Sequence, residues 1–267
     1  MKMPNPIIPE EIPREELPSL LVNWHFGPRA RRYMCRRRFA EVTGALGGMQ
    51  GGRVLDVGCG WGYNLFLLRE LGFDPIGIDI VQNDFPTARC VAEANGTCLQ
   101  LAGANVSSLP FRSGSFDAVT SVETLEHVYR EDRRSAFEEI ARVLVAGGRL
   151  SLSTPNYDSL VERGKRFITR NPVLKRFFPP MCYPVDGVSR ADYHPYSYHD
   201  PLRREEIEEL LRVSGFEPIS FRTIIFILKN TPGLLVPLVR LIEPLLERLP
   251  GLRRLGSTLT VAARKTL

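Results

Sequence analysis

The chain has 267 residues, of which 43% are hydrophobic and 24% charged, and its formal net charge is +5 at pH 7. This length and apolar content exclude a disordered or fibrous protein and suffice for one α/β domain with insertions or for two small domains. The 5 cysteines show no paired spacing, the start lacks the apolar core of a secretory signal, and no uncharged run is long enough for a transmembrane helix. We therefore expect a cytoplasmic protein with reduced thiols, whose modest positive charge permits anionic partners without demanding any.

Two segments precede the first strand. Residues 1–27 are predicted to be an extended N-terminal segment, since prolines recur up to Pro18. Residues 28–267 are predicted to form the main domain, beginning with a helix over 28–46 that has Pro28 in its first turn. Arginines at 29–38 surround much of this helix, so we interpret it as a solvated helix that covers the ligand pocket, with a membrane or nucleic-acid contact as the alternative.

A glycine-rich turn follows the first predicted strand. The apolar run 54–57 contains Asp56, and a helix over 64–71 begins after the turn. Such a turn lets a nucleotide-like cofactor approach the backbone at a helix N-terminus. Glycines stand at 58, 60 and 62, whereas the dinucleotide fingerprint also needs a glycine at the sixth position, which is Tyr63 here. The phosphate-loop pattern also fails, because no Gly-Lys-Ser/Thr follows.

The next elements continue a parallel α/β pattern. The strand over 74–80 carries Asp79 at its tip, about 20 residues after the glycines, where a carboxylate can hold a ribose diol. The turn 101–111, the strand 115–121 and the strand-forming segment 145–156 follow in order. This alternation predicts a doubly wound sheet with right-handed crossovers.

Over residues 53–156, these segments together resemble the class I S-adenosylmethionine-dependent methyltransferases. Within that family they are most similar to the ubiquinone-biosynthesis O-methyltransferase branch. The resemblance implies a seven-stranded, mostly parallel sheet with an antiparallel last strand, helices on both faces and a lid insertion after strand five. It implies that Asp79 binds the ribose and that Asn105, where relatives usually have Asp, accepts from the adenine amine. Ile80 and Val106 would sandwich the adenine ring. The residues assigned to the methionine end and its turn are Asp56, Gly58, Cys59, Gly60 and Gly62.

The candidate catalytic residues follow the fourth strand. If a helix starts there, Glu123, Glu126 and His127 share one face at i, i+3 and i+4, and they would hold Mg²⁺ or Mn²⁺. The arrangement is similar to metal sites in the ubiquinone-biosynthesis enzymes and in small-RNA 3′-terminal 2′-O-methyltransferases. A Glu-His pair without metal is widespread in the family, and we favour that alternative. Glu126 and His127 are then catalytic, with His194 preferred over His199 as the histidine that closes over the site.

The remainder of the chain contains two insertions. Residues 156–201, rich in aromatic and basic residues, are predicted to be an acceptor-binding lid that suits phosphorylated, carboxylated or lipid-linked acceptors, although a solvated basic surface is an equal alternative. A helix over 203–213, a strand over 215–228 and a last strand over 257–264 follow. The second insertion, 231–252, is apolar; its helix 234–249 has a narrow polar stripe and two prolines. We expect its apolar face to be buried against the sheet or a second subunit, with a bilayer interface or an acceptor cover as alternatives, because membrane-surface helices usually carry more Lys and Arg.

The resulting functional hypothesis is methyl transfer from S-adenosylmethionine to a hydroxyl of a small molecule, with a lipid-linked molecule or a glycan precursor among the candidates. RNA 2′-O-methylation is an alternative, but no RNA-binding module is appended, so a nucleic-acid partner is not expected. A cofactor-binding scaffold without activity is the other alternative. Peripheral contact with a membrane and the oligomeric state stay open.

Overall fold

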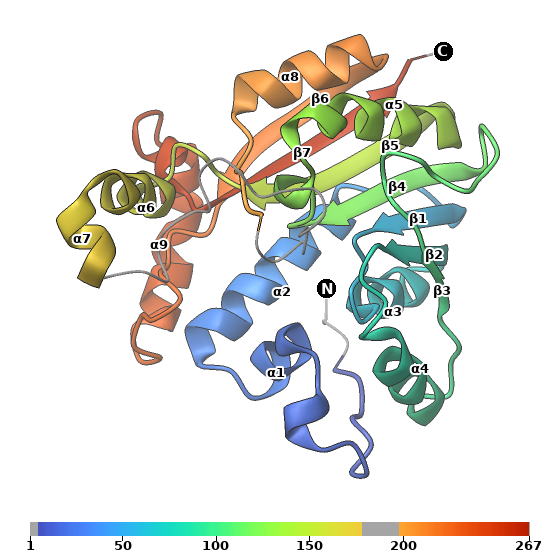
Figure 1. Ribbon diagram of the computed structural model, residues 1–267, viewed down its shortest axis with the longest axis horizontal. Coiled ribbons are helices and arrows are strands. Elements are labelled where there is room, and N and C mark those ends of the chain that lie inside the picture. The colour runs from blue at the N-terminus through green and yellow to red at the C-terminus, as the bar shows by residue number, and fades with distance from the viewer. Residues whose placement is uncertain (1–4, 178–197, 267) are drawn as a thin grey trace.

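The computed structural model describes residues 5–177 and 198–266, and its centre is a seven-stranded sheet (Figure 1). The strand order is β3-β2-β1-β4-β5-β7-β6. Strand β7 runs antiparallel to both of its neighbours, and the other paired strands are parallel. The strands are β1 (Arg53–Val57), β2 (Asp74–Asp79), β3 (Gln100–Gly103), β4 (Phe116–Val122), β5 (Leu144–Pro155), β6 (Phe216–Ile224) and β7 (Thr258–Lys265). The predicted mostly parallel sheet with an antiparallel last strand is confirmed.

Helices cover both faces of the sheet, as predicted (Figure 1). Helices α1 to α4 lie on one side and α5 and α8 on the other, while α9 packs beside α2. The helices are α1 (Ser19–His25), α2 (Arg29–Gly44), α3 (Tyr63–Glu70), α4 (Phe85–Ala94), α5 (Arg133–Val143), α6 (Leu160–Arg170), α7 (Pro172–Phe177), α8 (Arg204–Val213) and α9 (Val236–Arg248). Within the part of the chain that the structure describes, none of them has the length and apolar composition to cross a bilayer.

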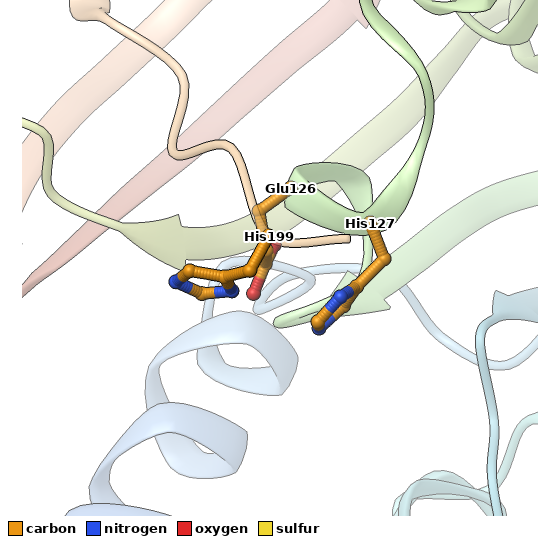
Figure 2. A group of neighbouring side chains, drawn as sticks. All are labelled: Glu126, His127 and His199. Carbon is orange, nitrogen blue, oxygen red and sulfur yellow. The ribbon is translucent and has the colours of Figure 1, made fainter. Parts of the chain in front are cut away.

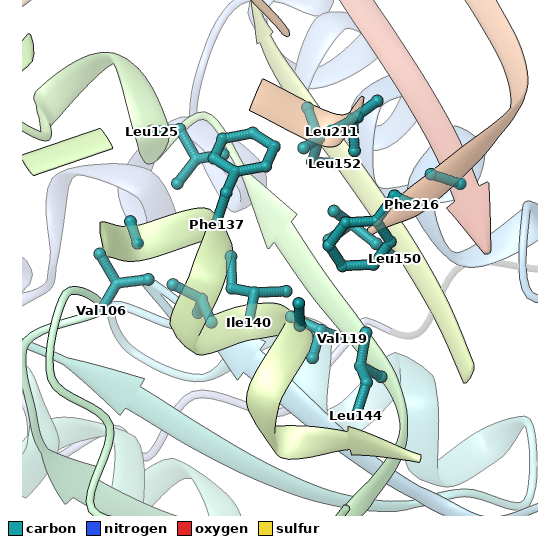
Figure 3. Close-up of a cluster of buried hydrophobic side chains, with 14 of the residues drawn as sticks. Val106, Val119, Leu125, Phe137, Ile140, Leu144, Leu150, Leu152, Leu211 and Phe216 are labelled. Atoms are coloured by element: carbon teal, nitrogen blue, oxygen red, sulfur yellow. The ribbon is translucent and has the colours of Figure 1, made fainter. Parts of the chain in front are cut away.

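The central strands are apolar on both sides because both sides are covered. In β1, Leu55 packs into the cluster under α5, whereas its neighbour Val54 packs into a cluster with Leu68 of α3. Figure 3 shows the first cluster, in which Phe137 and Ile140 of α5 face the sheet. Burying each such side chain contributes about 1.5–3 kcal/mol, so this packing fixes where the strand ends lie.

The prediction of an extended segment over residues 1–27 is wrong for its second half, which contains α1. Pro18 lies directly before this helix, and the apolar residues after it are drawn into the core. Leu21 and Trp24 are fully buried, and the Trp24 ring centroid lies 3.9 Å from that of Tyr63 at the start of α3. The prediction rested on the prolines and overlooked the apolar residues that follow them.

The two insertions differ from expectation in different ways. Residues 156–201 begin with α6 and α7, and the rest of the insertion, including His194, lies outside the described residues. The second insertion contains α9, as predicted, with Pro244 inside it. The expected burial of its apolar face against the sheet is wrong, since Leu241 is 78% exposed whereas Glu243 is 2% exposed, and burial against a second subunit stays a prediction. Strand β6 ends at Ile224 rather than at 228, because Ile225 has a φ of 66° and leaves the extended conformation.

Candidate functional site

The glycine turn between β1 and α3 exists because side chains do not fit there. Gly58 has a φ of 73°, and a Cβ on it would lie 2.1 Å from the Thr124 hydroxyl oxygen. The amides of Gly58 and Cys59 both donate to the Ile78 carbonyl, at 2.8 and 2.9 Å, so the turn is fixed to β2. Gly60 has a φ of 51°, and a Cβ on it would meet no other atom within 4 Å. Gly58 therefore allows close packing against Thr124, whereas Gly60 leaves open space beside the turn.

Asp79 at the tip of β2 is held in place by two backbone amides. One carboxylate oxygen accepts from Gly60 N and the other from Val81 N, each at 2.9 Å. The side chain lines the same cavity as the glycine turn. Each oxygen keeps a further lone pair and can accept another hydrogen bond, and the contact with a ribose diol stays a prediction.

Asp56 does not reach the cavity, contrary to its assigned role at the methionine end. It is buried in β1, and one carboxylate oxygen accepts from Asn64 Nδ2 and from Thr120 Oγ1, both at 2.7 Å. Burial raises the pKa of this carboxyl to about 7, against the opposing effect of these two hydrogen bonds. We conclude that Asp56 joins β1, β4 and α3 beneath the site.

Two more predicted cofactor residues lie behind the cavity wall. The Cys59 side chain is buried, and its pKa is raised well above the usual value by that burial. Gly62 starts α3 with a φ of 85°, and a Cβ there would lie 2.8 Å from Leu99 Cδ1. Neither residue lines the cavity and both shape the turn, while their role in cofactor binding stays a prediction.

The cavity itself has a volume of about 440 Å³, which lies in the range of small-molecule sites. Gly58, Gly60, Asp79, Ile80, Asn105 and Val106 line it, as the sequence predicted. The Asn105 amide oxygen accepts from Ser107 N at 2.9 Å, which fixes the turn after β3. Because an amide oxygen has two lone pairs, it can still accept from a ligand amine.

Helix α2 forms another wall of the cavity, through Cys35, Arg38 and Phe39. Arg38 pairs with Glu123 at 3.2 Å and donates to Thr258 Oγ1 at 3.1 Å. The prediction that the basic helix covers the pocket is confirmed in this respect. The sequence could not identify Arg38 as the arginine that reaches the site, because nothing in the sequence distinguishes it from the neighbouring arginines.

The acid-histidine segment after β4 is not the helix that was predicted. Glu123 has a φ of 52°, and only Leu125–His127 form a short 3-10 helix. Glu123 therefore turns toward Arg38. In its place, His199 approaches Glu126 and His127, and the candidate ligand atoms of these three residues lie within 4.8 Å of one another (Figure 2).

Burial governs the charges in this cluster of Glu126, His127 and His199. It raises the pKa of Glu126 well above its usual value, and the nearby Glu123 raises it further. Burial, together with Lys165 and His127, lowers the pKa of His199 to about 3. The His127 Nδ1 lies 2.6 Å from the Tyr198 carbonyl, which can only accept, so Nδ1 carries the proton and the lone pair is on Nε2.

His199 is held in position by the residue that follows it. Arg133 of α5 is 1% exposed and donates to the Asp200 carbonyl at 2.5 Å and to the Asp200 carboxylate at 3.0 Å. It also pairs with Glu206 at 2.6 Å. The Asp200 amide donates to the Glu126 carbonyl at 2.8 Å. These bonds attach the chain at His199 to the cluster, whereas the preferred His194 lies outside the described residues and its role stays a prediction.

Comparison with known families gives a consistent assignment. A family model described as a methyltransferase domain matches residues 55–152. The O-methyltransferase rstn1 of Aspergillus nomiae is 32% identical over 198 residues, which cover 73% of this chain and 75% of that protein. The ubiquinone biosynthesis O-methyltransferase of Bordetella avium is 29% identical over 69% of this chain and 70% of the relative. The O-methyltransferase resE of Aspergillus sclerotiorum is 29% identical over 70% of this chain, and the match spans 63% of its own length.

Solved structures share the fold. A putative sarcosine dimethylglycine methyltransferase from Galdieria sulphuraria superposes with a TM-score of 0.61 at 15% identity, covering 88% of each chain. The [4+2]-cyclase SpnF superposes with a TM-score of 0.59 at 21% identity, covering 89% of this chain and 83% of that one. Proteins described by different chemistries thus share this fold, so the reaction has to be argued from the site.

Proposed function

The chain belongs to the class I S-adenosylmethionine-dependent methyltransferases, and we propose that it transfers a methyl group from S-adenosylmethionine to a hydroxyl of a small molecule. The observation that carries this proposal is that His127 lines the same cavity as Gly60 and Asp79. An imidazole there stands within reach of both a cofactor at the glycine turn and an acceptor beside it.

The residues around the turn suit the cofactor. Asp79 would accept hydrogen bonds from the ribose diol, and Asn105 would accept from the adenine amine. The adenine ring would lie between Ile80 and Val106, both of which line the cavity. The sulfonium supplies an activated methyl group when it is bound.

The chemistry assigned to His127 is general-base catalysis. A hydroxyl is a poor nucleophile, so its oxygen attacks the methyl carbon efficiently only if its proton is removed. The C–O bond forms as the C–S bond breaks, and the proton passes to His127 Nε2. The Tyr198 carbonyl, which accepts from Nδ1, orients the ring for this transfer and stabilises the imidazolium that results.

The acceptor is proposed to be a small aromatic or lipid-linked hydroxyl compound. The relatives named above are O-methyltransferases, one of them of ubiquinone biosynthesis, which supports this class. The cavity also offers the rings of Phe39 and Tyr129 to such an acceptor. Binding by the insertion 156–201 is part of the proposal, and the segment 178–197 lies outside the described residues.

As the alternative to base catalysis by His127, a divalent cation is proposed at Glu126, His127 and His199. Two imidazoles and one carboxylate suit Mn²⁺ better than Mg²⁺, which prefers oxygen ligands. The donor set fits a cation chemically: His199 is neutral at pH 7, and a positive charge would reverse the raised pKa of Glu126. A cation would make a nearby hydroxyl more acidic, while His127 would then serve as its ligand.

The test of methyl transfer uses the purified chain with S-adenosylmethionine labelled in the methyl group and an extract of the native host. We expect label in a small molecule whose methyl group is bonded to oxygen, as shown by mass spectrometry, and much less label with Asp79→Ala. Label in RNA would favour the alternative of RNA 2′-O-methylation. Methyl groups on nitrogen or sulfur would refute the proposed acceptor class, and bound cofactor without any product would favour the scaffold.

The test of the cation is separate from turnover. Because a ligand that binds only the folded state stabilises it, Mn²⁺ should raise the melting temperature of the wild type. His199→Ala should lose this shift, and His25→Gln, a histidine change on α1, should keep it. If all three respond alike, or if none responds, the cation site is wrong and the general-base role of His127 stands without it.

A further inference from the structure

Helix α9 is turned with its charged stripe inward and its apolar face outward. Glu243 is 2% exposed, whereas Leu234 and Leu241 are 85% and 78% exposed. The outward face of α9 and its flanks, called the leucine face below, consists of Leu234, Leu235, Leu238, Leu241, Ile242, Leu245, Leu249 and Leu252. A contiguous apolar surface of this kind marks an interaction site.

This orientation is enforced by the two acids of α9. The Glu243 carboxylate accepts from the Tyr33 hydroxyl of α2 and, at 2.7 Å, from Phe226 N. The Glu247 carboxylate accepts from Arg37 of α2 at 2.9 Å and from Arg222 of β6 at 2.7 Å. Rotating α9 to bury its leucines would break all four bonds and leave buried charges unpaired, so the leucine face stays outward.

Exposed cations lie near the leucine face along the chain, and one of them, Arg240, has its guanidinium over the Tyr33 ring of α2, 5.5 Å from the ring centroid. Lys229, Arg240, Arg248, Arg253 and Arg254 are all exposed. Between residues 228 and 256 the only acids are Glu243 and Glu247, and both are turned inward. The outward surface therefore combines an apolar centre with a purely basic rim. Lys and Arg beside an apolar helix face are typical of a helix that lies on an anionic membrane.

We propose that the leucine face docks on a lipid bilayer that carries anionic headgroups. The leucines enter the boundary between headgroups and acyl chains, while the basic rim contacts phosphates. A second copy of the chain is a poorer occupant, because a two-fold contact through this face would bring the two basic rims together. The binding requires neither cofactor nor turnover, so the inference goes beyond the proposed function.

Docking through α9 would place the cavity near the bilayer. Tyr33 and Arg37 of α2 hold α9, and Cys35 and Arg38 of the same helix line the cavity. One helix thus connects the docking surface to the cavity wall.

The experiment is co-sedimentation of the full chain with vesicles of phosphatidylcholine alone or of phosphatidylcholine with phosphatidylglycerol. The variant Leu241→Glu/Leu245→Glu adds charge to the centre of the leucine face, and Arg248→Glu/Arg253→Glu reverses part of its rim. Ile219→Glu on β6 is the matched control, because Ile219 is 57% exposed but lies on a different element. Thermal melts verify that each variant is folded, and sedimentation velocity gives its oligomeric state.

We expect the wild type and Ile219→Glu to bind the anionic vesicles alike, and the leucine variant to partition about tenfold or more weakly, since burying one leucine already contributes a factor of this size. The rim variant should also bind more weakly, and added salt should weaken the wild type. The proposal is overturned if the wild type does not bind anionic vesicles, or if the leucine variant binds them as well as the wild type does. It is equally overturned if the wild type is a dimer that only the leucine variant dissociates, without vesicle binding.

Discussion

Replacing Gly58 by alanine tests why the turn after β1 must be glycine. The residue has a φ of 73°, which costs about 1–2 kcal/mol for a residue with a Cβ. The new Cβ would also lie 2.1, 2.2 and 2.7 Å from Oγ1, Cγ2 and Cβ of Thr124, and such overpacking costs about 1–3 kcal/mol. We therefore expect Gly58→Ala to lower the free energy of unfolding by about 2–5 kcal/mol.

Two further variants separate the backbone cost from the clash. Gly60→Ala has a similar backbone penalty, since its φ is 51°, but no atom lies within 4 Å of the new Cβ. Gly58→Ala/Thr124→Gly removes all three clashing atoms, so a double-mutant cycle should show a coupling of about 1–3 kcal/mol. Urea unfolding followed by circular dichroism measures the wild type, Gly58→Ala, Gly60→Ala, Thr124→Gly and the double variant. If Gly58→Ala is no less stable than Gly60→Ala, or if the coupling is zero, the packing argument fails.

Three further predictions concern residues around the cavity. Asp79→Ala should weaken cofactor binding about tenfold or more, because it removes a charged hydrogen-bond acceptor; calorimetry that gives an unchanged affinity would defeat the ribose assignment. In the folded state the Asp56 carboxyl keeps its proton up to a pH near its pKa of about 7, whereas in the unfolded chain it loses the proton near its ordinary pKa of 3.8. The wild type therefore loses stability as the pH rises between these two values. Asp56→Asn does not titrate, and its stability relative to the wild type should increase by about 4 kcal/mol from pH 4 to pH 8; a constant difference in urea unfolding would contradict the raised pKa. Arg133→Met should remove the buried partner of Asp200 and Glu206, which are themselves partly exposed, and Asp200 keeps its ion pair with Arg130. The free energy of unfolding should therefore fall by about 1–3 kcal/mol, and the Mn²⁺-induced shift in melting temperature should fall with it; a variant that keeps the full shift would show that Arg133 does not position His199.

The sequence predicted the sheet because its signals are local. Each of these signals can be recognised from a few neighbouring residues, as with the apolar strand 54–57, the glycines at 58 and 60 and the acid at 79. The same holds for Ile80, Asn105 and Val106, which line the cavity as expected. Asp56 was misassigned because an acid at the end of a buried strand looks the same whether it faces the cavity or the side chains of Asn64 and Thr120.

The parts that were missed depend on contacts between distant segments. Spacing placed Glu123 beside Glu126 on a helix, whereas its pairing with Arg38 of α2 and its positive φ turn it away. The choice of His199 depends on Arg133, about 70 residues earlier, which no local pattern reveals. Likewise, the outward turn of α9 follows from Tyr33 and Arg37, which lie 210 residues before their partners. The amphipathic pattern gave the two faces of that helix but not which one is buried.

The bonds at the two ends of the insertion also affect how this protein can evolve. At its start, Asn156 donates to the carbonyls of Arg254 and Gly256, at 2.8 and 2.7 Å. At its end, Arg133 binds Asp200 directly after His199. These bonds join described residues only, so substitutions within 178–197 remove none of them. If the insertion selects the acceptor, as proposed, its sequence can differ between acceptors while these attachments to the core are kept.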